Sequence, residues 1–167
     1  PYVFTRDVDW SDEVKNYLRI SHDYDDGLLS SLLDAAIESV ELFTGVSLHI
    51  RGLAAKIQSA TVSISLKHIP VLDINSVILK KDGQDEDISA DFGIILNGGG
   101  SIAVDEKYVG EDLEIQYQAG YREDLVPMTI KHGILMHVSN MYENSVDAAA
   151  LSSQIKDLYA PYRIIKI

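Results

Sequence analysis

The five histidines are the side chains best suited to bind a metal ion or to transfer protons near neutral pH. A site built from two histidines on one helix face needs a spacing of three or four residues. His132 and His137 are five residues apart, so on a helix their side chains project in different directions. His22, His49 and His68 have no other histidine close by along the chain. The pattern favours surface or capping histidines and predicts no metal ligand.

The carboxylates include two dense clusters, one at 23–26 and one at 82–87, among 26 acidic residues in all. Neither cluster follows the spacing of a calcium-binding loop, which alternates Asp or Asn ligands ahead of a glycine. The first cluster precedes a long apolar pattern and can cap a helix, while the second is typical of a solvated turn. Carboxylates for acid–base catalysis can converge from distant positions, but the sequence marks out no pair.

The signatures of covalent and phosphate chemistry are missing from the sequence. There is no cysteine, which excludes disulfides, thiolate catalysis and cysteine-based zinc sites. No G-x-S-x-G motif marks a serine nucleophile. The glycine-rich stretch 97–101 lacks the lysine of a phosphate-binding loop and precedes no expected helix, so it indicates a hairpin turn. We expect no enzyme, no cofactor-binding residue and no cofactor.

The charge balance limits the partners that this chain can have. The formal net charge is −12, from 26 acidic and 14 basic residues. Such a surface opposes binding to the phosphates of nucleic acids and to anionic membranes, because both need clustered Lys and Arg. No apolar run approaches the ~18 residues that cross a bilayer, and residues 1–6 lack the features of a signal peptide.

Helical periodicity dominates both ends of the chain. The clearest stripe ends before Gly45, a residue type common after helix C-termini. Its members are Leu28, Leu29, Leu32, Leu33, Ala36, Ile37, Val40 and Phe43. A shorter helix with Ser11 as its N-cap is expected before it. Another helix is expected after Pro127, and a last short one from near Asp147 to Pro161, which stops it.

The middle of the chain changes to the alternating pattern of β-strands. Strands are expected at 60–66, 76–80 and 113–117, and a hairpin from 92–96 and 101–104. The prediction is an α+β fold. It has a mainly helical core, made of an N-terminal helix pair plus C-terminal helices, with a small antiparallel β-sheet inserted between them.

The C-terminal end carries three isoleucines, Ile164, Ile165 and Ile167, within its last four residues. Exposing apolar surface to water costs about 25 cal/mol per Å². These side chains therefore either pack on the core of their own chain or insert into a partner, and the sequence leaves both alternatives open.

Segments spread along nearly the whole chain resemble, in the right order, the siphophage head–tail connector (adaptor, or head-completion) proteins. The matching stretches are 14–20, 25–29, 35–36, 41–45, 69–77, 117–121, 126–127, 141–144 and 158–163. They include the ends Glu41-Leu42-Phe43-Thr44-Gly45 and Leu158-Tyr159-Ala160-Pro161-Tyr162-Arg163. Two departures lie near the final helix: Ser145 stands where the family often has Arg, and Ala150-Leu151 where it often has Leu-Pro.

The resemblance implies a single head–tail connector domain over 1–167. It would have helical parts at 10–45 and 126–160, a β insertion at 46–120 and a C-terminal docking tail at 161–167. It also implies a structural virion protein in a tailed phage, prophage or phage-like particle. About a dozen copies would form a ring between portal and tail, in contact with the portal protein and a tail-completion protein.

In that setting DNA would pass through the ring without specific binding, since an acidic surface repels phosphates, and no membrane would be involved. The protein would be located at the head–tail interface of the virion, and in the host cytoplasm before assembly. The expected residues for docking on the portal or a neighbouring subunit are Tyr159, Pro161, Tyr162, Arg163, Ile164, Ile165 and Ile167.

Two other functions remain compatible with the residues. The first is a small acidic protein-binding module, such as a regulator or an inhibitor that mimics nucleic acid, whose carboxylates would gather on one face. The second is a hydrolase whose acidic residues converge in a pocket. For the tail residues, packing into the chain's own core is the simpler alternative to docking.

Overall fold

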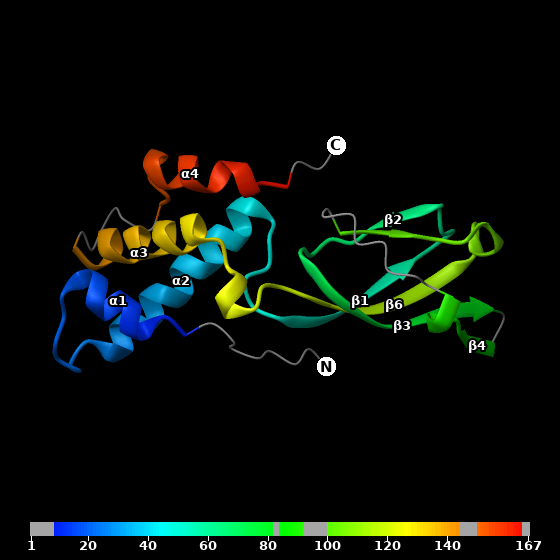
Figure 1. The fold of residues 1–167 in the computed structure, drawn as a ribbon, viewed down its shortest axis with the longest axis horizontal. Helices are drawn as coiled ribbons and strands as arrows, with labels where there is room; N and C mark the ends of the chain where they lie inside the picture. The colour runs from blue at the N-terminus through cyan, green and yellow to red at the C-terminus, as the bar shows by residue number, and fades with distance from the viewer. Residues whose placement is uncertain (1–8, 82–83, 92–99, 144–149, 165–167) are drawn as a thin grey trace. The chain divides into compact units, whose positions relative to one another are not determined.

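The computed structural model describes residues 9–81, 84–91, 100–143 and 150–164. The chain divides into two compact units (Figure 1). Among the described residues, the helical unit consists of two segments that are distant in the sequence, 9–48 and 122–164, and the β unit consists of the segment between them, 49–121. The predicted α+β class is confirmed, whereas the expected single connector domain over 1–167 stays a prediction.

The helical unit contains four α-helices, within the residues described, packed around one buried stripe. They are α1 (Ser11–Leu18), α2 (Asp26–Thr44), α3 (Met128–Glu143) and α4 (Ser153–Tyr159). Helix α2 packs mainly against α3, α1 packs on both, and α4 packs mainly on α3. The buried side of α2 carries Leu29, Leu33, Ala36, Ile37, Val40 and Thr44. Gly45 ends the helix in the left-handed conformation and donates its N–H to the Glu41 carbonyl at 2.8 Å.

The β unit contains a four-stranded antiparallel sheet and a separate two-stranded one. The larger sheet has the order β1-β6-β3-β4, and β2 pairs with β5. The strands are β1 (Arg51–Ile57), β2 (Ser63–Ser65), β3 (Val71–Lys81), β4 (Gln84–Asp87), β5 (Ser101–Ala103) and β6 (Asp112–Ala119). Short 3-10 turns occur in both units. The β unit contains η1 (Ser89–Asp91) and η2 (Glu106–Tyr108), and the helical unit contains η3 (Glu123–Leu125) and η4 (Ala160–Tyr162).

The core of the β unit follows from strand alternation. Every second residue of β6 is buried, from Leu113 to Ala119. These residues form one cluster with Val77 and Leu79 of β3 and with Ile102 of β5. The cluster therefore holds both sheets together around one apolar interior.

Some local predictions are wrong. The sequence pattern does not indicate β1, because its Gly52, Ala54 and Ala55 have low strand propensity. The acidic stretch expected to be a turn contains strand β4 over Gln84–Asp87. Ser11 is the first residue of α1 and its hydroxyl donates to Asp9, so it is not the N-cap.

Other predictions fall partly outside the described residues. The strand expected at 92–96 and the start of a helix near Asp147 lie there. What the structure describes of the last helix is α4, which begins at Ser153.

Gly120 holds the end of β6 where no side chain fits. Its φ is +136°, a conformation that L-residues with a side chain rarely adopt. A Cβ atom at this position would lie 2.3 Å from the backbone carbonyl oxygen of His49. The N–H of Gly120 donates to the Pro70 carbonyl at 2.9 Å, so the backbone is fixed from two sides. The glycine of the Tyr117–Tyr121 stretch is therefore a packing requirement of the β unit.

We expect Gly120→Ala to lower the free energy of unfolding by about 2–4 kcal/mol, because both the backbone angle and the carbonyl contact oppose a methyl group. Gly52→Ala is the matched control, since a Cβ there meets nothing within 4 Å. Urea unfolding followed by circular dichroism measures both variants. Equal unfolding midpoints for the two would contradict this account of Gly120.

Candidate partner-docking site

Helix α4 is anchored to the helical unit by its buried side. Its N-cap is Ser152, whose hydroxyl oxygen accepts a hydrogen bond from the Ile155 N–H at 3.4 Å. Ile155 and Tyr159 are fully buried, one turn apart on the same face. The outer side of α4 therefore points away from the unit that it packs against.

Tyr159 fits against a glycine of α3. A Cβ atom at Gly133 would lie 2.5–2.9 Å from three atoms of the Tyr159 side chain, so only glycine leaves room for this ring. The ring also lies 6.3 Å from that of Phe43 in α2, measured between centroids. Tyr159 is thus the residue that joins α4 to both long helices.

The hydroxyl of Tyr159 is buried without a hydrogen-bond partner among the described residues. Burial disfavours the charged phenolate and raises the pKa of Tyr159 above its ordinary value near 10. An unpaired buried hydroxyl is a cost to stability rather than a contribution to it. The ring, and not the hydroxyl, provides the packing.

Beyond α4 the chain returns to the end of α2. The guanidinium of Arg163 lies 5.4 Å from the centre of the Phe43 ring, within cation–π distance. The Ile164 N–H donates to the Thr44 carbonyl at 2.8 Å, and the Ile164 side chain lies against Gly45. The C-terminal segment is therefore attached to its own helical unit as far as Ile164.

The seven residues expected to dock on a partner are placed differently from one another. Tyr159 is fully buried, so its role in this structure is internal packing. Tyr162 and Ile164 are half-buried, while Pro161 and Arg163 are exposed. Ile165 and Ile167 lie outside the described residues. The docking role of this set stays a prediction, and the exposed members are those on the outer side of α4 and η4.

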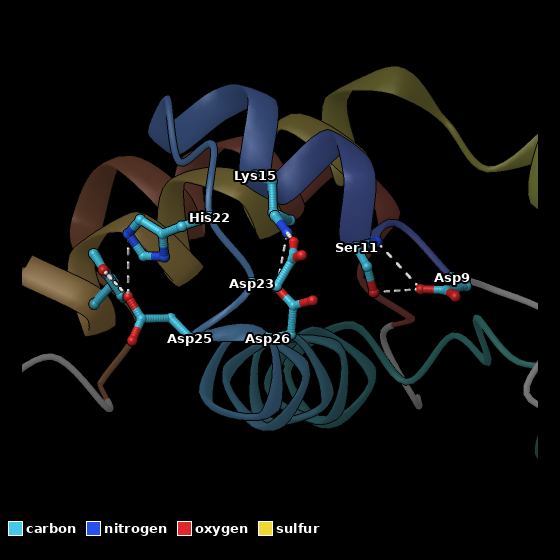
Figure 2. A network of polar contacts seen from close by, with 8 residues as sticks. Asp9, Ser11, Lys15, His22, Asp23, Asp25 and Asp26 are labelled. Atoms are coloured by element: carbon cyan, nitrogen blue, oxygen red, sulfur yellow. Dashed lines mark hydrogen bonds and ion pairs between the residues drawn. The ribbon is translucent and has the colours of Figure 1, made fainter.

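A second polar arrangement, shown in Figure 2, fixes the linker between α1 and α2. Lys15 of α1 donates to Asp23 at 2.6 Å and to Asp26 at 2.9 Å. The Tyr142 hydroxyl of α3 donates to Asp25 at 2.7 Å, and His22 lies 3.9 Å from the same carboxylate. The N-cap residue of α2, Asp25, makes no side-chain capping bond. The acidic cluster expected to cap α2 instead binds side chains of α1 and α3.

These contacts shift the pKa values of the side chains in this network. Hydrogen bonds from Lys15 lower the pKa of Asp23, and the two aspartates in turn raise the pKa of Lys15. The hydrogen bond to Asp25 raises the pKa of Tyr142. These groups form a structural network, since each shift arises from a contact that holds the linker.

The described residues contain no group of three His, Asp or Glu side chains able to hold a metal ion. A general acid at neutral pH needs a raised carboxyl pKa, whereas the pKa values of Asp23 and Asp87 are lowered, each by hydrogen bonds from neighbouring residues. No helix over the same residues is both long and apolar enough to cross a membrane.

Residues 12–90, just under half of the chain, match the family described as phage gp6-like head-tail connector protein. This segment is similar to that family. The resemblance expected from sequence is confirmed, and the connector family favours a structural protein over both the acidic regulator and the hydrolase. The match covers α1, α2 and the strands β1 to β4, and therefore parts of both units. None of the curated proteins matches this chain significantly.

Solved structures with the same fold come from gene transfer agent (GTA) particles. A chain in the neck of an empty GTA particle computed with C6 symmetry has a TM-score of 0.78 and 18% identity, covering 100% of this chain and 97% of that one. A chain in the virion of a native GTA particle gives 0.76 and 19%, covering 99% and 96%. A third, in a native GTA neck computed with C12 symmetry, gives 0.74 and 19%, covering 100% and 97%. The likeness in fold to these chains thus extends over 99–100% of this chain.

We expect Tyr159→Phe to leave the helical unit as stable as the wild type, or up to about 1 kcal/mol more stable, because it removes an unpaired buried hydroxyl. Because the pKa of Tyr159 is raised in the folded state, its contribution to the free energy of unfolding is fully present below pH ~10. That contribution is lost as the pH rises further. The variant should therefore lose less stability between pH 9 and 11. Trp10, the only tryptophan, lies in this unit, so its fluorescence follows the unfolding.

Tyr24→Phe is the matched control, since Tyr24 is 94% exposed and its loss should change neither the stability nor the alkaline response. A clear destabilisation by Tyr159→Phe would mean that the hydroxyl has a hydrogen-bond partner. It would contradict the conclusion that the ring of Tyr159, and not its hydroxyl, anchors α4.

Proposed function

We propose that this chain forms a ring between the portal and the tail of a tailed phage or phage-like particle, where it joins the two and lets DNA pass. The observation that carries the proposal is the match of residues 12–90 to the head-tail connector family. The fold shared with chains of GTA necks and virions supports it over the remaining length. One of those necks was computed with C12 symmetry, which suggests about twelve copies here.

The charge of the chain suits this role. A net charge of −12 repels the phosphates of a passing genome, so DNA can move through a ring without adhering to it. A connector also needs surfaces for a portal and for tail-completion proteins. We assign the docking tail to the exposed Pro161 and Arg163, the half-buried Tyr162 and Ile164, and the terminal Ile165 and Ile167.

The connector role is tested by deleting the gene in the particle-producing strain and restoring it from a plasmid. Without the protein, we expect DNA-filled heads and free tails, since the joint between them is missing. With it, electron microscopy of the particle neck should show the chain as a ring. Normal yields of joined particles in the deletion strain would overturn the proposal.

We expect the double substitution Ile165→Ser and Ile167→Ser to reduce the yield of joined particles at least about tenfold, because apolar side chains in a docking pocket contribute much of the binding energy. Thermal unfolding of the double variant separates a docking defect, which leaves the unfolding temperature unchanged, from a folding defect, which lowers it. Val62→Ser removes an exposed apolar side chain of the β unit and is the control. Wild-type yields from the double variant would contradict docking by the tail.

A further inference from the structure

The solvent side of α2 is unusually apolar for an exposed helix face. The residues opposite its buried stripe are all exposed and recur at three- and four-residue spacing: Leu28, Ser31, Ala35, Glu38 and Leu42. Leu42 is 79% exposed and Leu28 is 51% exposed, at the two ends of the stripe. We call these five residues the α2 outer stripe. Two exposed leucines joined by small side chains on one helix are typical of a surface that another helix covers.

The charges of α2 have one sign only. The helix contains four acidic residues and no Lys or Arg, so it has none of the opposite-charge pairs that usually line a solvated helix. Glu38 belongs to the α2 outer stripe, and the exposed Asp34 lies beside it. A partner that covers this stripe therefore needs a small apolar surface with basic side chains at its margin.

The outer side of α4 and η4 has that composition. Ala160 and Pro161 are exposed and provide a small apolar surface, with the exposed Lys156 before them and the exposed Arg163 after them in the sequence. The exposed Asp157 lies on the same side, so the net charge of this face is +1. From 152 to the end, the chain carries three basic residues and one acidic one, although the whole chain is strongly acidic. We call Lys156, Asp157, Ala160, Pro161 and Arg163 the α4 outer face.

We infer that the α2 outer stripe of one copy is covered by the α4 outer face of the next copy in the ring. This inference rests on the proposed connector function and identifies the contact that closes its ring. The two surfaces differ in charge and belong to different elements, so the contact is head-to-tail, as a ring requires. Glu38 meets the basic margin of the neighbour, and the leucines cover its small apolar residues.

Both surfaces can be used by the same copy at the same time. Helix α4 buries Ile155 and Tyr159 against its own unit, which leaves its outer face pointing away. The α2 outer stripe is opposite the side of α2 that packs against α3. Neither surface contributes to the core of the helical unit, so every copy can give one contact and receive another.

The size of the contact predicts when it forms. A 19-residue helix is ~28 Å long and ~10 Å wide, which gives a face of roughly 280 Å². A stable interface buries about 800 Å² on each partner. The purified protein should therefore be monomeric at micromolar concentration, and the ring should form where other particle proteins hold the copies side by side.

Cysteine cross-linking tests the inference cleanly, because the chain has no cysteine of its own. Ala35→Cys places a thiol in the α2 outer stripe, and Ala160→Cys places one in the α4 outer face; both positions are exposed. In oxidised particles made with the double variant, we expect a ladder of linked species longer than dimers. Each single variant can give dimers at most. The pair Val62→Cys and Ala160→Cys is the matched control and should give no ladder.

A double variant that joins heads to tails normally but gives no ladder overturns this interface and leaves the connector function standing. Efficient dimers from Ala35→Cys alone also overturn it, since they would mean that two α2 helices face each other. Absence of the wild-type chain from the particles would instead refute the connector function, and the interface with it.

A charge exchange provides a second readout that does not depend on oxidation. Glu38→Lys alone and Lys156→Glu alone should each lower the yield of joined particles about tenfold, because each places like charges together. The two substitutions combined should recover most of that loss. Since both residues are exposed, thermal unfolding of the single variants should match the wild type. Additive losses in the combined variant would contradict the pairing.

Discussion

The contact between the Tyr159 ring and Gly133 is the interaction on which the arrangement of the C-terminal region depends. It fixes α4 on α3, brings the ring close to Phe43 of α2, and leads the chain to Arg163 and Ile164 at the end of that helix. Because the inner side of α4 is used in this way, only its outer side is available to partners. A structural tyrosine therefore decides which residues of the last described segment face outward.

The acidic charge has two distinct uses in this molecule. In the linker between α1 and α2, carboxylates bind Lys15 of α1 and Tyr142 of α3 and thereby tie the linker to both helices. On the solvent side of α2, the carboxylates contact no basic residue of their own helix, since α2 has none. The first group stabilises the subunit, and the second distinguishes one surface from the basic α4 outer face. Composition alone does not separate these roles.

Local periodicity was sufficient to predict the helices and β6, because their buried residues repeat at the spacing of the element. It was insufficient for β1, where small residues conceal the alternation, and for β4, where all four residues are exposed. The contacts that form the candidate site join positions far apart in the sequence. Tyr142 and Asp25 are 117 residues apart, and no local pattern encodes such a pair. The isoleucines of the tail indicated that apolar side chains there need a covering surface. The sequence could not decide whether that surface belongs to the same chain or to a partner.

Strand β4 has a consequence for the behaviour of this protein at high concentration. It is the last strand of its sheet among those described, and its four residues, Gln84–Asp87, are all exposed and mostly acidic. A sheet edge normally invites a strand from another molecule to add to it, and charged side chains at the edge prevent this. Mutual repulsion between these carboxylates on two copies therefore opposes pairing at this edge and fibrous aggregation. The same residues that add nothing to the core thus help to keep folded copies apart.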